Sequence, residues 1–125
     1  MEAGVLLDIE GKPIHWHVPE GRTAASLPDS RVLWQIIWWN RKRVGGFAHT
    51  HPGKGVPGPS YTDVTTFSAI EIGLGRPLLW PILSEDDGAM YRHEGPGKYH
   101  YTRCPQTIVA EWADLLRKLT RKEGA

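Results

Sequence analysis

The sequence predicts an α/β (α+β) fold in which helices flank a single mixed β-sheet. Apolar residues make up 40% of the 125 residues and charged residues 23%, which is ordinary for a globular protein. A chain of this length typically forms one domain, here residues 1–125, with a core of its own. Along it, short apolar runs alternate with segments of helical period, the order expected for helices packed on a sheet.

The first two elements are expected to form a β-hairpin. Gly4–Asp8 is a short apolar run, and residues 9–12 have the composition of a turn. Residues 13–18 alternate in polarity as a second strand. The apolar side chains of this strand should share one face and its two histidines the other, exposed face: Ile14, Trp16 and Val18 against His15 and His17.

A helix is expected next, from a cap at Asp29 or Ser30 to about Lys42. Its apolar side chains recur at helical spacing and predict packing on the sheet. Its tryptophans differ, because Trp34 and Trp38 are four residues apart and share a face, whereas the next residue, Trp39, is rotated away. Trp39 is therefore expected either to be exposed, as a contact for a second copy of the chain in a homo-oligomer or for a partner protein, or to pack on the last helix.

The middle of the chain is predicted as strand, loop and helix. Val44–His49 is a short apolar strand, and residues 53–59 are rich in glycine and proline, which favours a loop. A second helix is expected from a cap at Ser60 to about Gly73.

The last third is predicted as a hairpin followed by a helix. Residues 77–83 and 89–92 are the strands, joined by the turn Asp86-Asp87-Gly88. The final helix is expected at about residues 105–121. Four further side chains are assigned from their sequence context, with two tryptophans in the core and two histidines at the surface: Trp80 and Trp112, and His93 and His100.

The chemistry-bearing residues lie between the third predicted strand and the second helix. His49 and His51 are two residues apart at the strand end, so both side chains can face one ion. Asp63 follows in the first turn of the helix, three residues after Ser60. Two imidazoles and a carboxylate are the ligand types of a catalytic zinc site, which keeps one position open, although Mn, Fe or Co also accept such ligands. The sequence therefore predicts one Zn²⁺ per chain.

Other metal-site patterns fit less well. A cupin places a glutamate a few residues after the second histidine, where this chain has Gly55-Val56. A zinc deaminase needs a later cysteine pair, and the chain has a single cysteine, Cys104. The other His-x-His segment, His15 to His17, is followed by no Ser-x-x-Asp, so it is not expected to bind metal.

The segment from His49 to Asp63 reads His-x-His-Pro followed by Pro-Ser-x-x-Asp, and it resembles the signature of the JAB/MPN (JAMM) zinc metalloproteases of compact prokaryotic type. The resemblance covers most of the chain and implies the cytidine-deaminase-like architecture of that family. It also implies that His49, His51 and Asp63 bind the zinc and that the Ser60 hydroxyl stabilises the oxyanion. The intervening loop, residues 52–59, is one residue longer than usual in the family.

The resemblance further implies a glutamate, upstream of the histidines, that acts as general base. Three glutamates precede His49: Glu2, Glu10 and Glu20. Glu10 lies in the hairpin turn, at the end expected to be far from the site. Glu2 directly precedes the first strand and is the favoured candidate, and Glu20, after the second strand, is the alternative.

The family cleaves peptide or isopeptide bonds that join ubiquitin-like proteins to a partner, and its prokaryotic members act on ubiquitin-like or sulfur-carrier proteins of the β-grasp fold. The resemblance thus implies such a protein as substrate. Two alternatives remain open. One is a non-catalytic MPN scaffold that binds a ubiquitin-like partner, and the other is a metallohydrolase that acts on a small substrate.

The composition excludes some other classes of function. A formal net charge of +1 offers no general attraction for nucleic acid. No apolar run approaches about 18 residues, so no membrane span is expected. A single cysteine, and no signal-peptide pattern at the start of the chain, agree with a cytoplasmic location.

Overall fold

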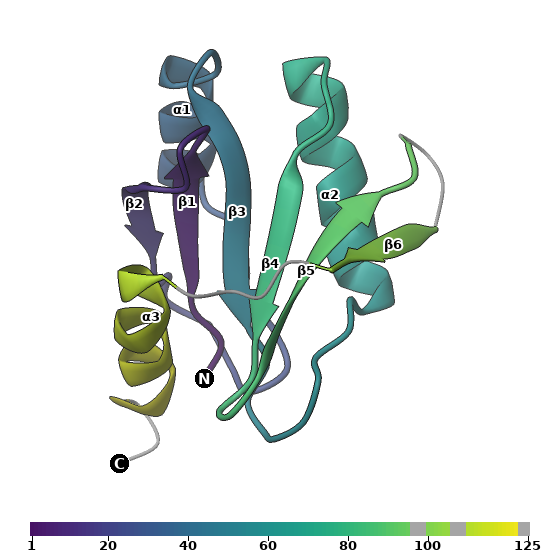
Figure 1. Cartoon of the computed structure of the whole chain (residues 1–125). Coiled ribbons are helices and arrows are strands. Elements are labelled where there is room, and N and C mark those ends of the chain that lie inside the picture. Colours follow the sequence, from purple (N-terminus) through teal and green to yellow (C-terminus); the bar gives the residue numbers. More distant parts are fainter. Residues whose placement is uncertain (96–99, 106–109, 123–125) are drawn as a thin grey trace.

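The protein is described here by a computed structural model that covers residues 1–95, 100–105 and 110–122. In this part of the chain, helices lie on both faces of a six-stranded sheet (Figure 1). The elements in chain order are β1 (Gly4–Asp8), β2 (Pro13–His17), α1 (Arg31–Trp39), β3 (Val44–Thr50), α2 (Tyr61–Leu74), β4 (Leu79–Leu83), β5 (Gly88–His93), β6 (Tyr101–Cys104) and α3 (Glu111–Lys122).

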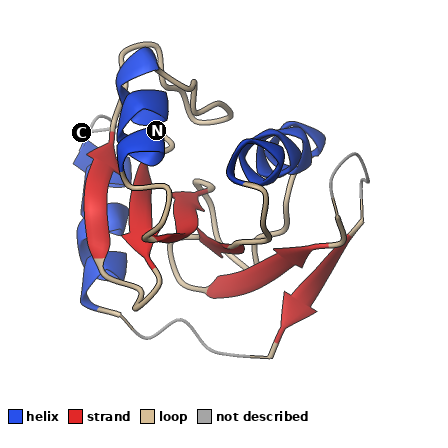
Figure 2. Cartoon of the chain, turned by 90° about the horizontal axis from the view of Figure 1, so that it is seen from above, coloured by secondary structure: helices blue, strands red, loops and turns tan. Residues whose placement is uncertain are grey.

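The sheet is mixed, as expected. Its strand order is β2-β1-β3-β4-β5-β6, with β3 parallel to β4 and every other neighbouring pair antiparallel. Helix α2 connects the two parallel strands, which cannot be joined by a tight turn. Seen from above, α1 and α2 lie on one side of the sheet and α3 on the other (Figure 2).

Each face of the sheet has its own apolar core. The α1/α2 core contains inward side chains of both helices and one face of the strands: Leu6, Leu33, Ile37, Phe47, Phe67, Ile70, Trp80 and Ile82, among others. The α3 core contains the opposite face: Ala3, Val5, Leu7, Ala48, Leu83, Trp112 and Leu116, among others. The alternation of neighbouring residues between the two cores follows the period of two along a strand.

Helices α1 and α2 are each capped by a serine, as predicted. The Ser30 hydroxyl accepts a hydrogen bond from Leu33 N, and α1 ends at Trp39 rather than near Lys42. At α2, Ser60 and Asp63 form a reciprocal capping box. This helix ends at Leu74 and is capped by Gly75, whose φ of 72° suits glycine.

Strand β2 corrects one prediction. The pairing register with β1 shifts between Leu6 and Leu7, so Ile14 is an extra residue that changes the phase of the strand. Ile14 therefore packs against the α1/α2 core and Trp16 against the α3 core, not together. His17 is only 3% exposed and donates from Nε2 to the Pro28 carbonyl at 2.6 Å, so its predicted exposure is wrong.

Three further predictions differ from the structure. Strand β6 was not expected, since its four residues are exposed or half-buried and form no apolar alternation. His93 is buried rather than at the surface. Trp34 packs against the α1/α2 core whereas Trp38 is 55% exposed, so the face that these two were predicted to share is not buried at both residues. Trp38 lies about a third of a turn from the direction of Leu33 and Ile37, the residues that α1 buries.

Other assignments are confirmed. Trp80 and Trp112 are buried, while Trp39, at 73%, and His100 are exposed. The last helix is observed from Glu111, and the part of the prediction over residues 106–109 lies outside the described residues.

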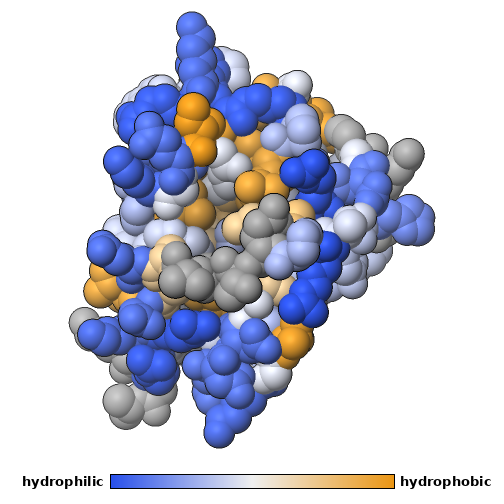
Figure 3. Space-filling model, in the orientation of Figure 1, coloured by the Kyte–Doolittle hydropathy of each residue, from blue (hydrophilic) through white to orange (hydrophobic). Residues whose placement is uncertain are grey.

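Within the described ranges, none of the helices combines the length and the apolar character that a membrane span requires. On the face that α3 covers, hydrophilic side chains gather over the lower end of the molecule (Figure 3).

Candidate metal centre

His49 and His51 lie where β3 ends, on the face of the sheet that α2 covers. His49 is 4% exposed, and its ring makes an edge contact with Phe67 of α2, with centroids 6.5 Å apart. His51 N donates to the Leu83 carbonyl at 2.8 Å, which continues the pairing with β4 for one residue beyond the strand. The two imidazoles therefore point to the same side, as the spacing predicted, and their Nε2 atoms lie 3.1 Å apart.

Asp63 completes this group from the first turn of α2. Its Oδ2 atom lies 3.1 Å from His49 Nε2 and 2.9 Å from His51 Nε2. The three predicted ligands thus direct two nitrogens and one oxygen at each other. Two ligand atoms of a tetrahedral zinc, each about 2.0–2.1 Å from the ion, lie about 3.4 Å apart. The observed separations are a few tenths of an ångström shorter, so small shifts would bring the donor set to that geometry.

Ser60 lies at the edge of this group. Its hydroxyl accepts a hydrogen bond from Asp63 N at 3.1 Å, and its own backbone N–H donates to Asp63 Oδ2 at 2.9 Å. The cap of α2 therefore fixes the carboxylate that faces both imidazoles. Ser60 is exposed, so its hydroxyl proton can be directed to a group bound from solvent.

Glu2 reaches the same place from β1. Gly4 pairs with His49 across β1 and β3, and alternation places Glu2 on the face of Leu6 and the two histidines. One carboxylate oxygen of Glu2 and a nitrogen of each histidine lie within 4.8 Å of one another. Glu2 is 5% exposed. The favoured upstream glutamate therefore lies beside the histidines.

The Glu2 backbone is held by segments far away in the sequence. Its N–H donates to the Thr23 carbonyl at 2.7 Å, and Arg22 donates from Nη1 to the Glu2 carbonyl at 3.1 Å. Arg22 also donates to the Leu119 carbonyl of α3 at 3.3 Å. No sequence pattern indicates this role of Arg22, because its partners are backbone atoms.

The other two upstream glutamates do not belong to this group. Glu10 is exposed in the hairpin turn, with Lys12 Nζ at 3.3 Å. Glu20 is exposed in the loop after β2. Among the described residues, the cluster that could hold a metal contains Glu2, His49 and His51, and it includes neither Glu10 nor Glu20.

The close approach of these groups changes their pKa values. Burial would raise the pKa of Asp63, but hydrogen bonds from His49 and His51, the charge of His49 and the Ser60 N–H hold it well below its usual range. The hydrogen bond to Asp63 raises the pKa of His51, against the effect of burial. Burial raises the pKa of Glu2, and the nearby histidines only partly offset it.

The loop between His51 and Ser60 is tied to the turn between β4 and β5. Gly55 N donates to Asp86 Oδ1 at 2.9 Å, the Ser84 hydroxyl donates to the Gly55 carbonyl at 2.6 Å, and Tyr91 donates to the Pro57 carbonyl. Gly53 and Gly55 have φ values of 115° and 96°, which side chains rarely adopt. The loop is thus a segment whose backbone has defined hydrogen-bond partners.

A second carboxylate–imidazole pair lies near the other end of α2. Glu71 Oε1 lies 2.9 Å from His93 Nδ1, and the two side chains are 2% and 0% exposed. Glu71 Oε2 accepts hydrogen bonds from Leu78 N at 2.9 Å and Trp80 Nε1 at 3.1 Å. Sequence reasoning missed this pair because its members are 22 residues apart on different elements.

No protein-family model matches the chain, and no curated protein matches its sequence.

Proposed function

We propose that this protein is a zinc-dependent peptidase or isopeptidase of the JAB/MPN type. The observation that carries the proposal is that the side chains of Glu2, His49, His51 and Asp63 lie close together although they come from three separate parts of the fold. The group is partly accessible to solvent, with His51 25% and Asp63 15% exposed. Burying several titratable groups together costs free energy, so such clusters are found mainly at functional sites. The donor set of two imidazoles and a carboxylate suits zinc.

In this proposal His49, His51 and Asp63 hold the metal, and Glu2 moves the proton. Zinc, when bound, supplies Lewis-acid polarisation of the scissile carbonyl and acidifies the attacking water. Glu2 takes the proton of that water and delivers it to the leaving amine. Its burial supports this role, because a raised carboxyl pKa brings the group closer to neutral pH, where a base and acid is most effective.

Ser60 orients the reacting carbonyl. Its oxygen is occupied as the acceptor for Asp63 N, which leaves the hydroxyl proton to donate to the oxyanion that develops in the transition state. A donor in such a position typically contributes about 10²–10³ to the rate. The two roles of Ser60, as helix cap and as donor, use different atoms and do not compete.

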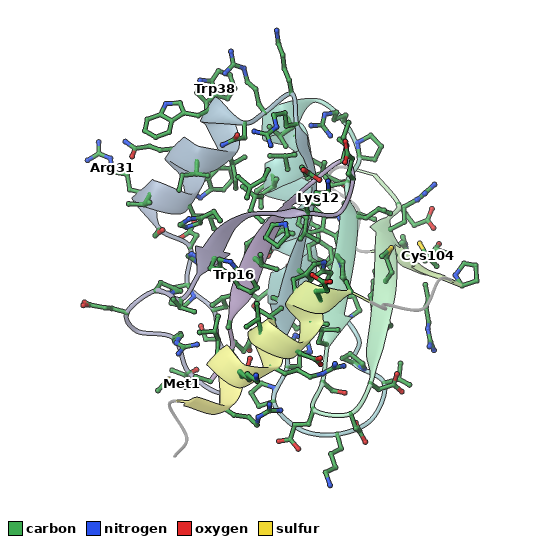
Figure 4. The ribbon with its side chains drawn as sticks, turned by 60° about the vertical axis from the view of Figure 1, so that its left-hand side comes forward. Met1, Lys12, Trp16, Arg31, Trp38 and Cys104 are labelled. Carbon is green, nitrogen blue, oxygen red and sulfur yellow. The ribbon has the colours of Figure 1, made fainter. Side chains whose placement is uncertain are left out.

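We further propose that the substrate is a ubiquitin-like or sulfur-carrier protein of the β-grasp fold, on the strength of the resemblance of residues 49–63 to the family signature. The position of the exposed tryptophans, Trp38 and Trp39, argues against their contacting this substrate. Trp38 lies at the end of the molecule opposite Met1, which precedes Glu2 (Figure 4). The Trp38–Trp39 surface is proposed instead as a contact between copies of the chain.

The test combines metal content with hydrolysis of a β-grasp fusion protein, for the wild type and for Glu2→Gln and Glu20→Gln. The wild type should contain about one zinc per chain and cleave the fusion at the C-terminus of the β-grasp domain. Loss of a positioned general base typically costs about 10²–10⁴ in rate. Glu2→Gln should lose this much, and the exposed Glu20→Gln is the matched control that should lose none.

Each component of the proposal has its own contrary result. Absence of stoichiometric zinc from the wild type would contradict the metal centre. Full zinc content without cleavage of fusions or isopeptides would favour a binding scaffold. Equal activity of Glu2→Gln and the wild type would remove Glu2 from the mechanism.

A further inference from the structure

A hollow of about 310 Å³ opens beside the metal centre on the α3 side of the sheet. His51 forms part of its wall, together with Thr50, the β4–β5 turn at Ser84 and Glu85, and the C-terminal half of α3. The hollow is distinct from the side on which Asp63 and Ser60 lie, and His51 belongs to both. A group bound in it would therefore be next to the proposed reaction centre.

Two arginines of α3, Arg117 and Arg121, line this hollow. Arg117 is fixed by the β4–β5 turn, since its Nε and Nη2 atoms donate to the carbonyls of Ser84 and Asp87, each at 2.9 Å. Carbonyl partners position a guanidinium without cancelling its charge. Of the carboxylates in the described part of the chain, Asp114, which is exposed, forms an ion pair with Arg117, with 3.9 Å between Oδ1 and Nη1. An arginine held in this way is preorganised for an anion.

Arg121 is exposed one helical turn further along α3. None of the described carboxylates forms an ion pair with it. Among the described residues that line the hollow there is one acidic side chain, Glu85, against two arginines. The lining thus has an excess of positive charge in a molecule whose net charge is only +1. Such a local excess favours an anionic ligand.

We propose that this hollow binds a carboxylate of the substrate next to the scissile bond, and that this carboxylate is the free C-terminus of the residue released. The inference rests on the proposed function and narrows its substrate class to protein tails that lose a terminal amino acid. Water adds to the scissile carbonyl and the C–N bond breaks. The new acid remains on the tail, and the proton carried by Glu2 goes to the amine of the free amino acid.

The size of the hollow agrees with a small terminal group. Ligand pockets typically measure about 300–1,000 Å³, and this one lies at the lower limit. It can take an amino-acid residue but not a folded domain. An acidic side chain of the substrate offers the same chemistry as a terminal carboxylate, so the experiment must separate these two sources.

The experiment uses zinc-loaded protein and has two readouts. One is hydrolysis of the added peptide, and the other is the change in the NMR shifts of the arginine Nε–H groups when the peptide binds. The probes are matched peptides with a free C-terminus, an amidated C-terminus, or an amidated C-terminus preceded by glutamate. A hydrogen-bonded ionic contact is typically worth about tenfold in affinity. The free acid should therefore bind about tenfold tighter than the plain amide and be cleaved preferentially.

Arg121→Gln should remove most of this preference. Lys118→Gln is the matched control, because Lys118 is an exposed cation of the same helix that does not line the hollow. Equal binding of acid and amide, or equal losses in the two variants, would overturn the proposal. Tighter binding of the glutamate amide than of the free acid would reject the terminal carboxylate as the source.

The two readouts separate this proposal from the proposed function. Discrimination in binding without hydrolysis of any peptide or fusion would contradict the peptidase but keep the carboxylate site. Hydrolysis that is indifferent to the C-terminal group would keep the peptidase and reject the site.

Discussion

Helix α2 carries a carboxylate that meets histidine near each of its ends, and the two centres differ in almost every other respect. Asp63 and Glu71 are eight residues apart, or about 12 Å along the helix axis. The Asp63 centre gathers His49 and His51 around one oxygen and retains solvent contact, with His51 25% and Asp63 15% exposed. The Glu71 centre has one histidine and is closed to solvent.

The hydrogen bonds of the two carboxylates explain the difference. Glu71 uses both oxygens on protein groups that join α2 to β4 and β5, and its side chain is only 2% exposed. Asp63 concentrates its contacts on Oδ2, opposite two nitrogens that also lie close to each other. Exposure and convergence of donors, rather than the His–carboxylate pairing itself, therefore distinguish a candidate ligand site from a structural contact.

The largest effect is expected from Glu71→Ala. It leaves the Leu78 N–H and the Trp80 indole without their acceptor in the core, and breaking a buried pair of this kind typically costs about 3–5 kcal/mol. Urea unfolding measures the loss. Glu71→Gln keeps an oxygen for both donors and should lose less. A loss of zinc by folded Glu71→Gln protein would show that the two centres are not independent.

Asp63→Asn should give the converse result. The amide oxygen can still accept from Ser60 N in the cap, but the anionic ligand is gone. Zinc affinity should fall more than about 100-fold, since changes to groups that merely support ligands already cost 10–100-fold. Competition with a chelator measures this. Addition of zinc should raise the unfolding temperature of the wild type and not of the variant. An unchanged zinc affinity would remove Asp63 from the ligand set.

Ser60→Ala and Ser30→Ala separate the two roles of a capping serine. Both remove a hydroxyl that accepts from the third residue of a helix, so each should cost about 1 kcal/mol of stability. Only Ser60→Ala should also slow hydrolysis, by about 100-fold. Steady-state kinetics on the two folded variants makes the comparison. Equal rates for both would reduce Ser60 to a cap.

His17 is a buried histidine with no carboxylate at hydrogen-bond distance in the described chain, and it gives the smallest effect. Burial lowers its pKa, although the hydrogen bond to Pro28 partly offsets this. Below about pH 6.5 the unfolded chain then binds more protons than the native state, so stability falls as the pH decreases through this range. In His17→Gln the stability should depend less on pH between about 7.5 and 5.5. The free energy of unfolding is measured in urea at each pH. If it changes with pH to the same extent in both proteins, His17 does not contribute.

The sequence predicted most of the fold because its strong signals are local. Apolar runs identified β1, β3 and β4, and serine caps located the starts of α1 and α2. The convergence of His49, His51 and Asp63 was also predictable, since a strand end and the following helix start meet across one short loop. The placement of Glu2 followed from the same reasoning, because it directly precedes β1, the neighbour of β3.

The rest depended on tertiary contacts that leave no local signal. β6 exists through its pairing with β5, and its exposed residues lack the alternation that marks a half-buried strand. The register shift at Ile14 reverses the faces of β2, which a regular alternation cannot reveal. The burial of His93 depends on Glu71, which belongs to another element.

The clamp formed by Arg22 has a consequence for the order of assembly. It joins the Glu2 carbonyl to the Leu119 carbonyl, and these two residues lie near opposite ends of the described chain. Contacts between such distant residues require closure of a long loop and form slowly compared with local ones. The histidines and Asp63 can meet within a segment of 15 residues, whereas Arg22, which holds the Glu2 carbonyl, gains its contact with Leu119 only when α3 has docked. The proposed ligands can thus come together before α3 docks, and the last contact that holds the Glu2 segment forms afterwards.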